Sequence, residues 1–178
     1  MSLPADRSLE QFHPTALGHT VPRPRLDEER ELAETVARRL GRSLHVRHLD
    51  AGSCNGCDWE IAALLNPIHD VQRLGIDFVA SPRHADLLLV TGVMTRNLEE
   101  AALRTYEAMP EPRLVVAVGA CAISGGVFAG TYAARNGIGG VFPVDVFVPG
   151  CPPRPEALIH GLLMAMGRME PRIRPGLP

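Results

Sequence analysis

Residues 52–60 have the sequence GSCNGCDWE, which contains two of the four cysteines of the chain, Cys54 and Cys57. The other two lie far downstream, where Cys121 follows Gly-Ala and Cys151 follows Pro-Gly. The pattern is C-x2-C, then 63 residues, then C, then 29 residues, then C. Iron–sulfur clusters are held by four cysteine thiolates, so the pattern predicts one cluster that uses every cysteine.

Each cysteine segment follows a short run that is typical of a β-strand. The runs are LHVRHL at 44–49, LVVAV at 114–118 and VDVFV at 144–148. The second is continuously apolar, as expected of a strand buried on both faces, and the third is rich in β-branched and aromatic residues. If the runs are parallel strands of one sheet, all four thiols lie at carboxyl ends of strands, where open α/β sheets place their ligands.

Further strands and helices alternate along the chain. Two more buried strands are predicted at 76–80 and 87–91, and helices are predicted at 27–40, 58–65, 97–109 and 155–169. The Gly-rich segment 119–140 is predicted to be an ordered loop with a short helical turn. The alternation predicts an α/β fold, a parallel sheet with helices on both faces. Cys57 is then at or near a helix N-terminus, where backbone N–H groups stabilise negative charge.

The predicted domain organisation has three parts. Residues 1–43 are a Pro-rich extended arm plus an amphipathic helix, 44–170 are the cluster-binding α/β domain, and 171–178 are a short C-terminal tail. The arm is either a loose terminus or a segment ordered on a partner. The helix at 27–40, with Asp27 as its cap, carries an apolar stripe that faces the core, or docks on a membrane subunit or the bilayer surface.

The composition of the chain argues against several classes of protein. The chain has 178 residues, 46% of them hydrophobic, and a formal net charge of −2, which argues against disorder and against a basic nucleic-acid surface. No apolar run approaches the ~20 residues of a membrane span, and the N-terminus lacks the apolar core of a signal peptide. We therefore expect a cytosolic protein, in which four cysteines are metal ligands rather than disulfides.

Two other uses of the cysteines compete with a cluster. Zinc ribbons generally use two C-x2-C pairs on short hairpins, whereas two of the cysteines here are single, so a structural zinc is the weaker alternative and stays open. A redox-active C-x-x-C dithiol would leave the other two cysteines unexplained. The stretch 119–130 has neither G-x-G-x-x-G nor G-x4-G-K-[ST], and its glycines are expected to let backbone approach the cluster and donate N–H groups to sulfur.

Four motifs carry a resemblance to a known family. They are GSCNGCDWE at 52–60, SPRHAD at 81–86, GACA at 119–122, and PVD with VPGCPPRP at 143–145 and 148–155. They resemble the small-subunit family shared by respiratory complex I (its 20 kDa cluster subunit) and energy-converting, membrane-bound nickel–iron hydrogenases. The resemblance runs from about residue 44 to 166. It implies a flavodoxin-like fold and one 4Fe–4S cluster on Cys54, Cys57, Cys121 and Cys151.

Within that family the first cysteine pair favours one branch. The complex I subunit has adjacent cysteines there, whereas Asn55 and Gly56 separate them here, as in hydrogenases of the formate hydrogenlyase and hydrogenase-4 type. The resemblance implies an electron relay between a nickel–iron large subunit and a ferredoxin-like multi-cluster subunit. Integral membrane subunits would hold the complex on the cytoplasmic side of the inner membrane, and the chain alone would not be catalytic. A complex I-like quinone oxidoreductase and a zinc-stabilised scaffold protein are the alternatives.

Five further residues are candidates for the cluster environment. Asp58 and Glu60 follow the second ligand and either take part in proton movement or supply charge to the helix N-terminus. Arg83 and His84 resemble the segment near the quinone pocket of complex I relatives, or are interfacial. Arg154 is expected to hold the last ligand loop or a partner carboxylate.

Overall fold

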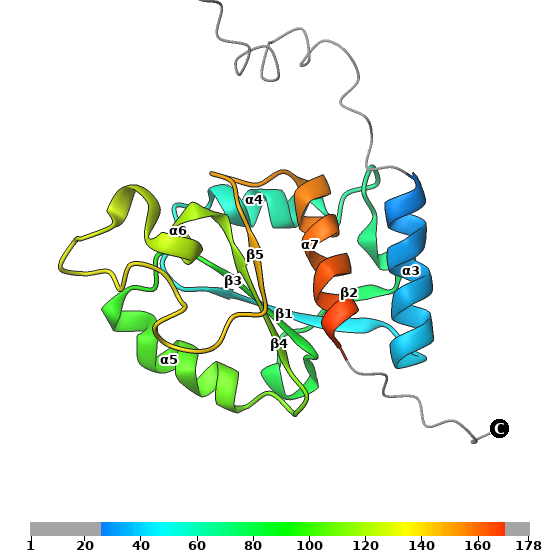
Figure 1. Cartoon of the computed structure of the whole chain (residues 1–178), viewed down its shortest axis with the longest axis horizontal. Coiled ribbons are helices and arrows are strands. Elements are labelled where there is room, and N and C mark those ends of the chain that lie inside the picture. The colour runs from blue at the N-terminus through cyan, green and yellow to red at the C-terminus, as the bar shows by residue number, and fades with distance from the viewer. Residues whose placement is uncertain (1–25, 170–178) are drawn as a thin grey trace, which may run out of the picture.

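Five parallel strands form one sheet in the order β2-β1-β3-β4-β5 (Figure 1). The computed structural model describes residues 26–169, so the predicted arm and the C-terminal tail lie outside the described residues. The elements in chain order are α3 (Leu26–Leu40), β1 (Leu44–Asp50), α4 (Gly56–Ala63), η1 (Val71–Leu74), β2 (Ile76–Phe78), η2 (Pro82–His84), β3 (Leu87–Thr91), α5 (Arg96–Glu107), β4 (Leu114–Val118), α6 (Gly119–Ser124), η3 (Gly126–Phe128), β5 (Val146–Val148) and α7 (Pro155–Arg168).

The strand order identifies the fold class. The order 2-1-3-4-5, with every neighbouring pair parallel, is that of flavodoxin-like sheets. The predicted α/β fold with a parallel sheet is therefore confirmed. Among residues 26–169, no helix is long and apolar enough to cross a membrane.

The side chains of the strands divide between two cores, one on each face of the sheet. In β3, Leu87 and Leu89 belong to the core under α3, α4 and α7, whereas Leu88 and Val90 belong to the core under α5 and α6. Successive side chains of a strand point to opposite faces, and both faces are covered here, so β3 and β4 are buried at every position.

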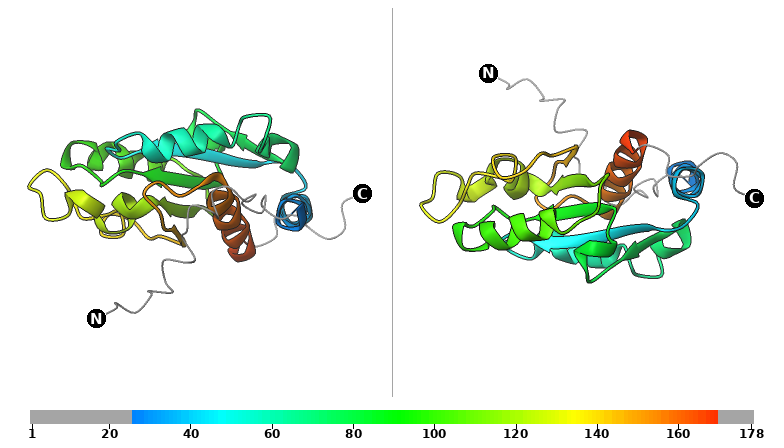
Figure 2. Two further views of the ribbon diagram at one scale, coloured as in Figure 1. Left: turned by 90° about the horizontal axis from the view of Figure 1, so that it is seen from above. Right: turned by 90° about the horizontal axis from the view of Figure 1, so that it is seen from below.

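Helix α3 belongs to the first of these cores. Its apolar stripe, represented by Leu32 and Val36, is buried, and the helix lies beside α7 (Figure 2). The stripe therefore faces the core, and the bilayer-facing alternative is wrong for these side chains. Asp27 lies inside the first turn of the helix instead of capping it. The domain boundaries at residues 43 and 170 stay predictions.

Several element bounds differ from those predicted, for local reasons. Helix α4 begins at Gly56, two residues early, because Asn55 adopts a left-handed conformation (φ 67°) that turns the chain directly into the helix. Cys57 therefore lies in the first turn, and the prediction that it lies at a helix N-terminus is confirmed. Strand β5 begins late, at Val146, because the Asp145 carboxylate accepts the Val115 N–H at 2.8 Å.

Candidate metal centre

The four cysteines come from segments that leave the sheet at one end. Cys54 lies in the loop after β1 and Cys57 in the first turn of α4, whereas Cys121 lies in α6, directly after β4, and Cys151 follows β5. In Figure 1 these segments lie together at the upper end of the sheet. All four thiols are free. The predicted location of the cysteines is confirmed, although two of them lie in helices and not in loops.

Short contacts join the cysteine segments to one another. The N–H of Ala120 donates to the carbonyl oxygen of Gly150 at 2.8 Å, which joins the segments of the third and fourth cysteines. A Cβ added at Gly56 would lie 3.6 Å from Cys54 Sγ and 3.8 Å from Pro152, so the first and fourth segments also touch.

Two glycines let the backbone come close to the thiols. A Cβ at Gly119, where φ is +84°, would lie 2.6 Å from Cys57 Sγ, which is closer than side chains tolerate. At Gly126 (φ +53°) it would lie 3.1 Å from Cys121 Sγ. The predicted approach of backbone to the sulfurs is present, and the donation of N–H groups to a bound cluster stays a prediction.

Burial and neighbouring charges change the pKa values of two of the four thiols. Burial raises the pKa of the Cys57 thiol to about 11, and the charges of Asp58 and the other three cysteines contribute to this rise. Burial and two of the other cysteines also raise the pKa of Cys121. Raised pKa values favour the neutral thiols of these two residues, and bound metal ions would favour their thiolates instead. The donor set, four cysteines, is that of an iron–sulfur cluster or of zinc. Within residues 26–169, however, no group of three or more His, Cys, Asp or Glu side chains has the arrangement that holds a metal ion.

Asp58 accepts hydrogen bonds from three different segments. Its Oδ2 accepts from Ser53 Oγ at 2.5 Å, and its Oδ1 accepts from Thr91 Oγ1 at 2.8 Å. The Nε2 atom of His48 lies 3.1 Å from Oδ1. Burial lowers the pKa of His48, although the Asp58 charge opposes this, so we treat this contact as a hydrogen bond from a neutral ring. The sequence did not reveal His48 or Thr91, because these two residues lie on different strands and form no local motif with Asp58.

The remaining candidate residues are spread over two ends of the sheet. Glu60 lies on α4, half-buried, and Arg154 is exposed just before α7; neither side chain has a hydrogen bond or ion pair within the part of the chain that the structure describes. Arg83 and His84 form η2, before β3, and are exposed. They therefore lie at the amino end of the strands, and the structure does not bring them together with the cysteines.

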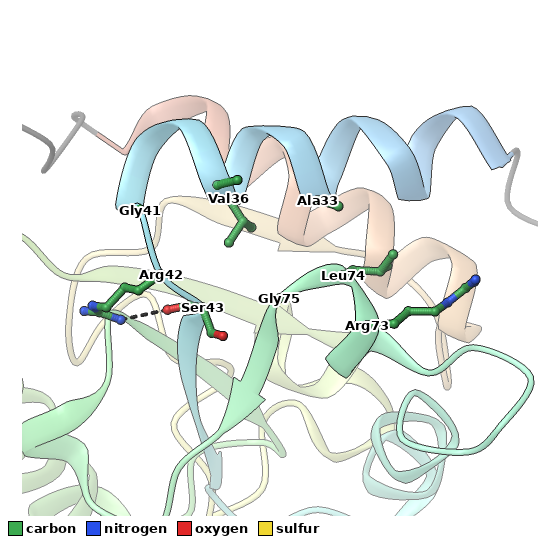
Figure 3. Close-up of a pocket in the computed structure, with 9 residues that line it drawn as sticks. Ala33, Val36, Gly41, Arg42, Ser43, Arg73, Leu74 and Gly75 are labelled. Carbon is green, nitrogen blue, oxygen red and sulfur yellow. Dashed lines mark hydrogen bonds between the residues drawn. The ribbon is translucent and has the colours of Figure 1, made fainter.

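A cavity of about 450 Å³ also lies away from the cysteines, between α3 and the turn that precedes β2 (Figure 3). Arg42 and Arg73 stand at its two ends. Each is already paired with a carboxylate: Arg42 donates two 2.8 Å hydrogen bonds to buried Asp86, and Arg73 pairs with Glu29. Both of these charges are therefore compensated within the fold.

Comparison with solved structures supports the fold. A chain of the membrane-bound sulfane sulfur reductase, an archaeal respiratory membrane complex, is 36% identical with a TM-score of 0.64, over 77% of this chain and 75% of that one. A chain of an NAD⁺-reducing [NiFe]-hydrogenase in the H2-reduced state, 23% identical, has a TM-score of 0.56 over 75% of this chain and 97% of that one, which shows a shared fold.

Sequence relatives come from two kinds of oxidoreductase. The Pyrococcus furiosus protein named "Probable membrane-bound hydrogenase subunit mbhJ" is 45% identical over 84% of this chain and 89% of its own length. Formate hydrogenlyase subunit 7 of Escherichia coli is 45% identical over 78% of this chain and 54% of its own length. An NADH-quinone oxidoreductase subunit of Citrifermentans bemidjiense is 52% identical over 60% of this chain and 62% of its own length.

A family model settles the resemblance seen in the motifs. It matches residues 54–165, a span that begins at the first cysteine and includes the other three. This span covers more than half of the chain and agrees with the strand order and with the relatives. The chain therefore belongs to the family of the NADH ubiquinone oxidoreductase 20 Kd subunit.

Proposed function

We propose that this chain holds one 4Fe–4S cluster on Cys54, Cys57, Cys121 and Cys151 and serves as an electron-transfer subunit of a membrane-associated hydrogenase complex. The observation that carries the proposal is the position of the four free cysteines, which follow three strands at one edge of the sheet, with glycine backbone against two of their sulfur atoms. When bound, such a cluster supplies reversible one-electron transfer. The chain has no cysteine left over as a nickel ligand, so catalysis belongs to a partner.

The exposure of the cysteines supports a relay at a subunit interface. Cys57 and Cys121 are partly buried and hold the inner side of the site, whereas Cys54 and Cys151 are exposed. An exposed cluster edge would let a redox centre of a partner subunit come close. The partner subunit would then cover that edge and exclude water.

Large apolar side chains near the cysteines support a covering partner. Trp59, two residues after Cys57, is 75% exposed, and Val127, next to the Gly126 that lies against Cys121 Sγ, is 82% exposed. Exposed aromatic residues beside a functional site are typical of protein interfaces. The partners we propose are a nickel–iron large subunit, a ferredoxin-like multi-cluster subunit and integral membrane subunits that hold the complex on the cytoplasmic side of the inner membrane.

The hydrogenase branch is favoured over a complex I-like one by two observations. The first cysteine pair is separated by two residues, as the resemblance implies for hydrogenases. The alignments with two hydrogenase-complex subunits also cover 84% and 78% of this chain, against 60% for the NADH-quinone oxidoreductase subunit. A complex I-like quinone oxidoreductase is the second candidate, because the family model and the 52% identity of that last relative favour it.

Metal analysis of the native complex separates these candidates. The chain is purified anaerobically from its own cells with the subunits that travel with it, and iron, nickel and zinc are counted against protein. Iron with nickel is the expected result. Iron without nickel, in a sample with a confirmed large subunit, would favour the complex I-like candidate. Zinc without iron would instead support a zinc-stabilised scaffold and contradict both redox candidates.

Replacement of Trp59 by alanine is expected to weaken the affinity for the large subunit about tenfold or more, because exposed tryptophans at interfaces contribute a large share of the binding energy. Ile68 is a matched control, since it is 73% exposed but lies beyond the far end of α4. Affinity is measured by titrating the loaded variants with purified large subunit. Equal affinity of Trp59→Ala and wild type would place the partner on another surface.

A further inference from the structure

The loop that carries the first two cysteines rests on the end of β3. The N–H of Ala51 donates to the Thr91 carbonyl at 2.9 Å, and the N–H of Val93 donates to the Gly52 carbonyl at 3.3 Å. A Cβ at Gly92 would lie 2.6 Å from the carbonyl carbon of Gly52, so the two backbones are in direct contact. Backbone contacts thus fix where the loop begins, but they end before Cys54.

Side-chain hydrogen bonds continue the attachment toward the cysteines. The Asp50 Oδ1 atom accepts the N–H groups of Gly52 and Ser53 at 2.8 and 2.7 Å. The Ser53 hydroxyl then accepts the N–H of Asn55 at 3.0 Å and donates to Asp58 at 2.5 Å. The loop is therefore closed onto the first turn of α4 by a single carboxylate, that of Asp58.

The direction of each hydrogen bond around Asp58 follows from the donors available. Thr91 has one hydroxyl proton, which goes to Asp58 Oδ1 at 2.8 Å, so its oxygen is left to accept. His48 Nε2 lies 3.0 Å from that oxygen and 3.1 Å from Asp58 Oδ1, and both are acceptors. Nε2 therefore carries the proton of the neutral ring. Asp58 acts as acceptor for β1, β3 and the cysteine loop at once.

We propose that Asp58 is a positioning residue whose carboxylate fastens the Cys54–Cys57 loop to the ends of β1 and β3 and so keeps the two thiols in place for the cluster. The inference rests on the proposed function. It differs from a role in proton transfer, because it requires only that the Asp58 carboxylate accept hydrogen bonds from the loop and the two strands. Connected hydrogen bonds rigidify the groups that they join, and Thr91, to which Asp58 is attached on β3, is fully buried.

The test uses the full chain, loaded anaerobically with iron and sulfide, and compares Asp58→Asn, Thr91→Val and the double variant. The rate of iron loss to a chelator and the EPR spectrum of the reduced protein are recorded. Asp58→Asn is expected to lose iron roughly tenfold faster with an altered spectrum, because bonds to a charged acceptor are lost. Thr91→Val is expected to act in the same direction, and Thr91→Ser, which keeps the hydroxyl, to restore the wild-type rate.

The double variant distinguishes a shared network from a simple loss of charge. If both residues act through one attachment, the double variant increases the rate of iron loss by clearly less than the product of the fold-increases in the two single variants. Glu100→Gln is the control, because it removes one carboxylate from an exposed ion pair on α5 and leaves the loop untouched. Multiplicative effects, or an unchanged loss rate and spectrum in Asp58→Asn, would overturn the positioning role. If the wild-type chain gives no cluster signal, the proposed function itself fails. The positioning role alone fails if the wild-type chain holds a cluster and the Asp58→Asn variant loses iron at the same rate.

Discussion

Replacement of Cys121 by serine is expected to remove most of the iron from the chain and to abolish or alter its reduced EPR signal. The thiol lies in α6, partly buried, with the backbone of Gly126 against it. A serine hydroxyl is not deprotonated at neutral pH and is a much poorer ligand for iron than a thiolate. Iron content and EPR of the anaerobically loaded variant are measured beside the wild type.

The same result is expected for the other three cysteines, since each would hold one corner of the site. Ser124→Ala is a suitable control, because Ser124 lies in the same short helix, is exposed, and donates only a 3.3 Å hydrogen bond to a backbone carbonyl. The control should keep its iron. A Cys121→Ser protein with unchanged iron and spectrum would refute the assignment of this cysteine as a ligand.

Replacement of Gly92 by alanine is expected to destabilise the chain by about 2 to 5 kcal/mol. Gly92 has φ +87°, which is unfavourable for alanine, and a Cβ would meet three backbone atoms of Gly52 and Ser53 at 2.6 to 2.8 Å. Backbone cannot rotate away as a side chain can, so the cysteine loop must shift. The free energy of unfolding is measured by urea denaturation of the metal-free full chain under reducing conditions.

Gly167→Ala provides a control of opposite sign. Gly167 lies near the end of α7, and a Cβ there meets nothing within 4 Å. Alanine is a better helix former than glycine, so this change should stabilise the chain by up to about 1 kcal/mol. Equal stability of Gly92→Ala and wild type would mean that the loop does not rest on β3 as described.

The strands most easily predicted from the sequence are those with the simplest environment. The runs at 87–91 and 114–118 are buried at every position, and β3 and β4 have these bounds in the structure. Edge strand β5 was predicted too long: the Asp145 N–H still donates to the Val115 carbonyl, but the Val115 N–H donates to the Asp145 carboxylate instead of to a backbone carbonyl of β5. Helix α6 was predicted only as a helical turn in a loop, since six residues are too few to show a helical period.

The parts of the candidate site whose place follows from the order of residues along the chain could be predicted. The parts that depend on tertiary packing could not. The cysteines follow strands, and parallel strands all end at one edge of the sheet, so their meeting could be predicted. Arg83 and His84 precede β3, so the same reasoning places them at the opposite edge, which the motif resemblance did not reveal. Two of the three partners of Asp58, His48 and Thr91, lie on strands that only the folded chain brings together. The ligand role of the cysteines stays a prediction.

One 4Fe–4S cluster on four cysteines would be detected by measuring iron and acid-labile sulfide in the anaerobically purified full chain, with EPR before and after reduction. We expect about four irons and four sulfides per chain and an EPR signal that appears on one-electron reduction. Zinc bound in place of iron, or iron without sulfide and without a reducible signal, in a sample never exposed to oxygen, would contradict the proposed cluster.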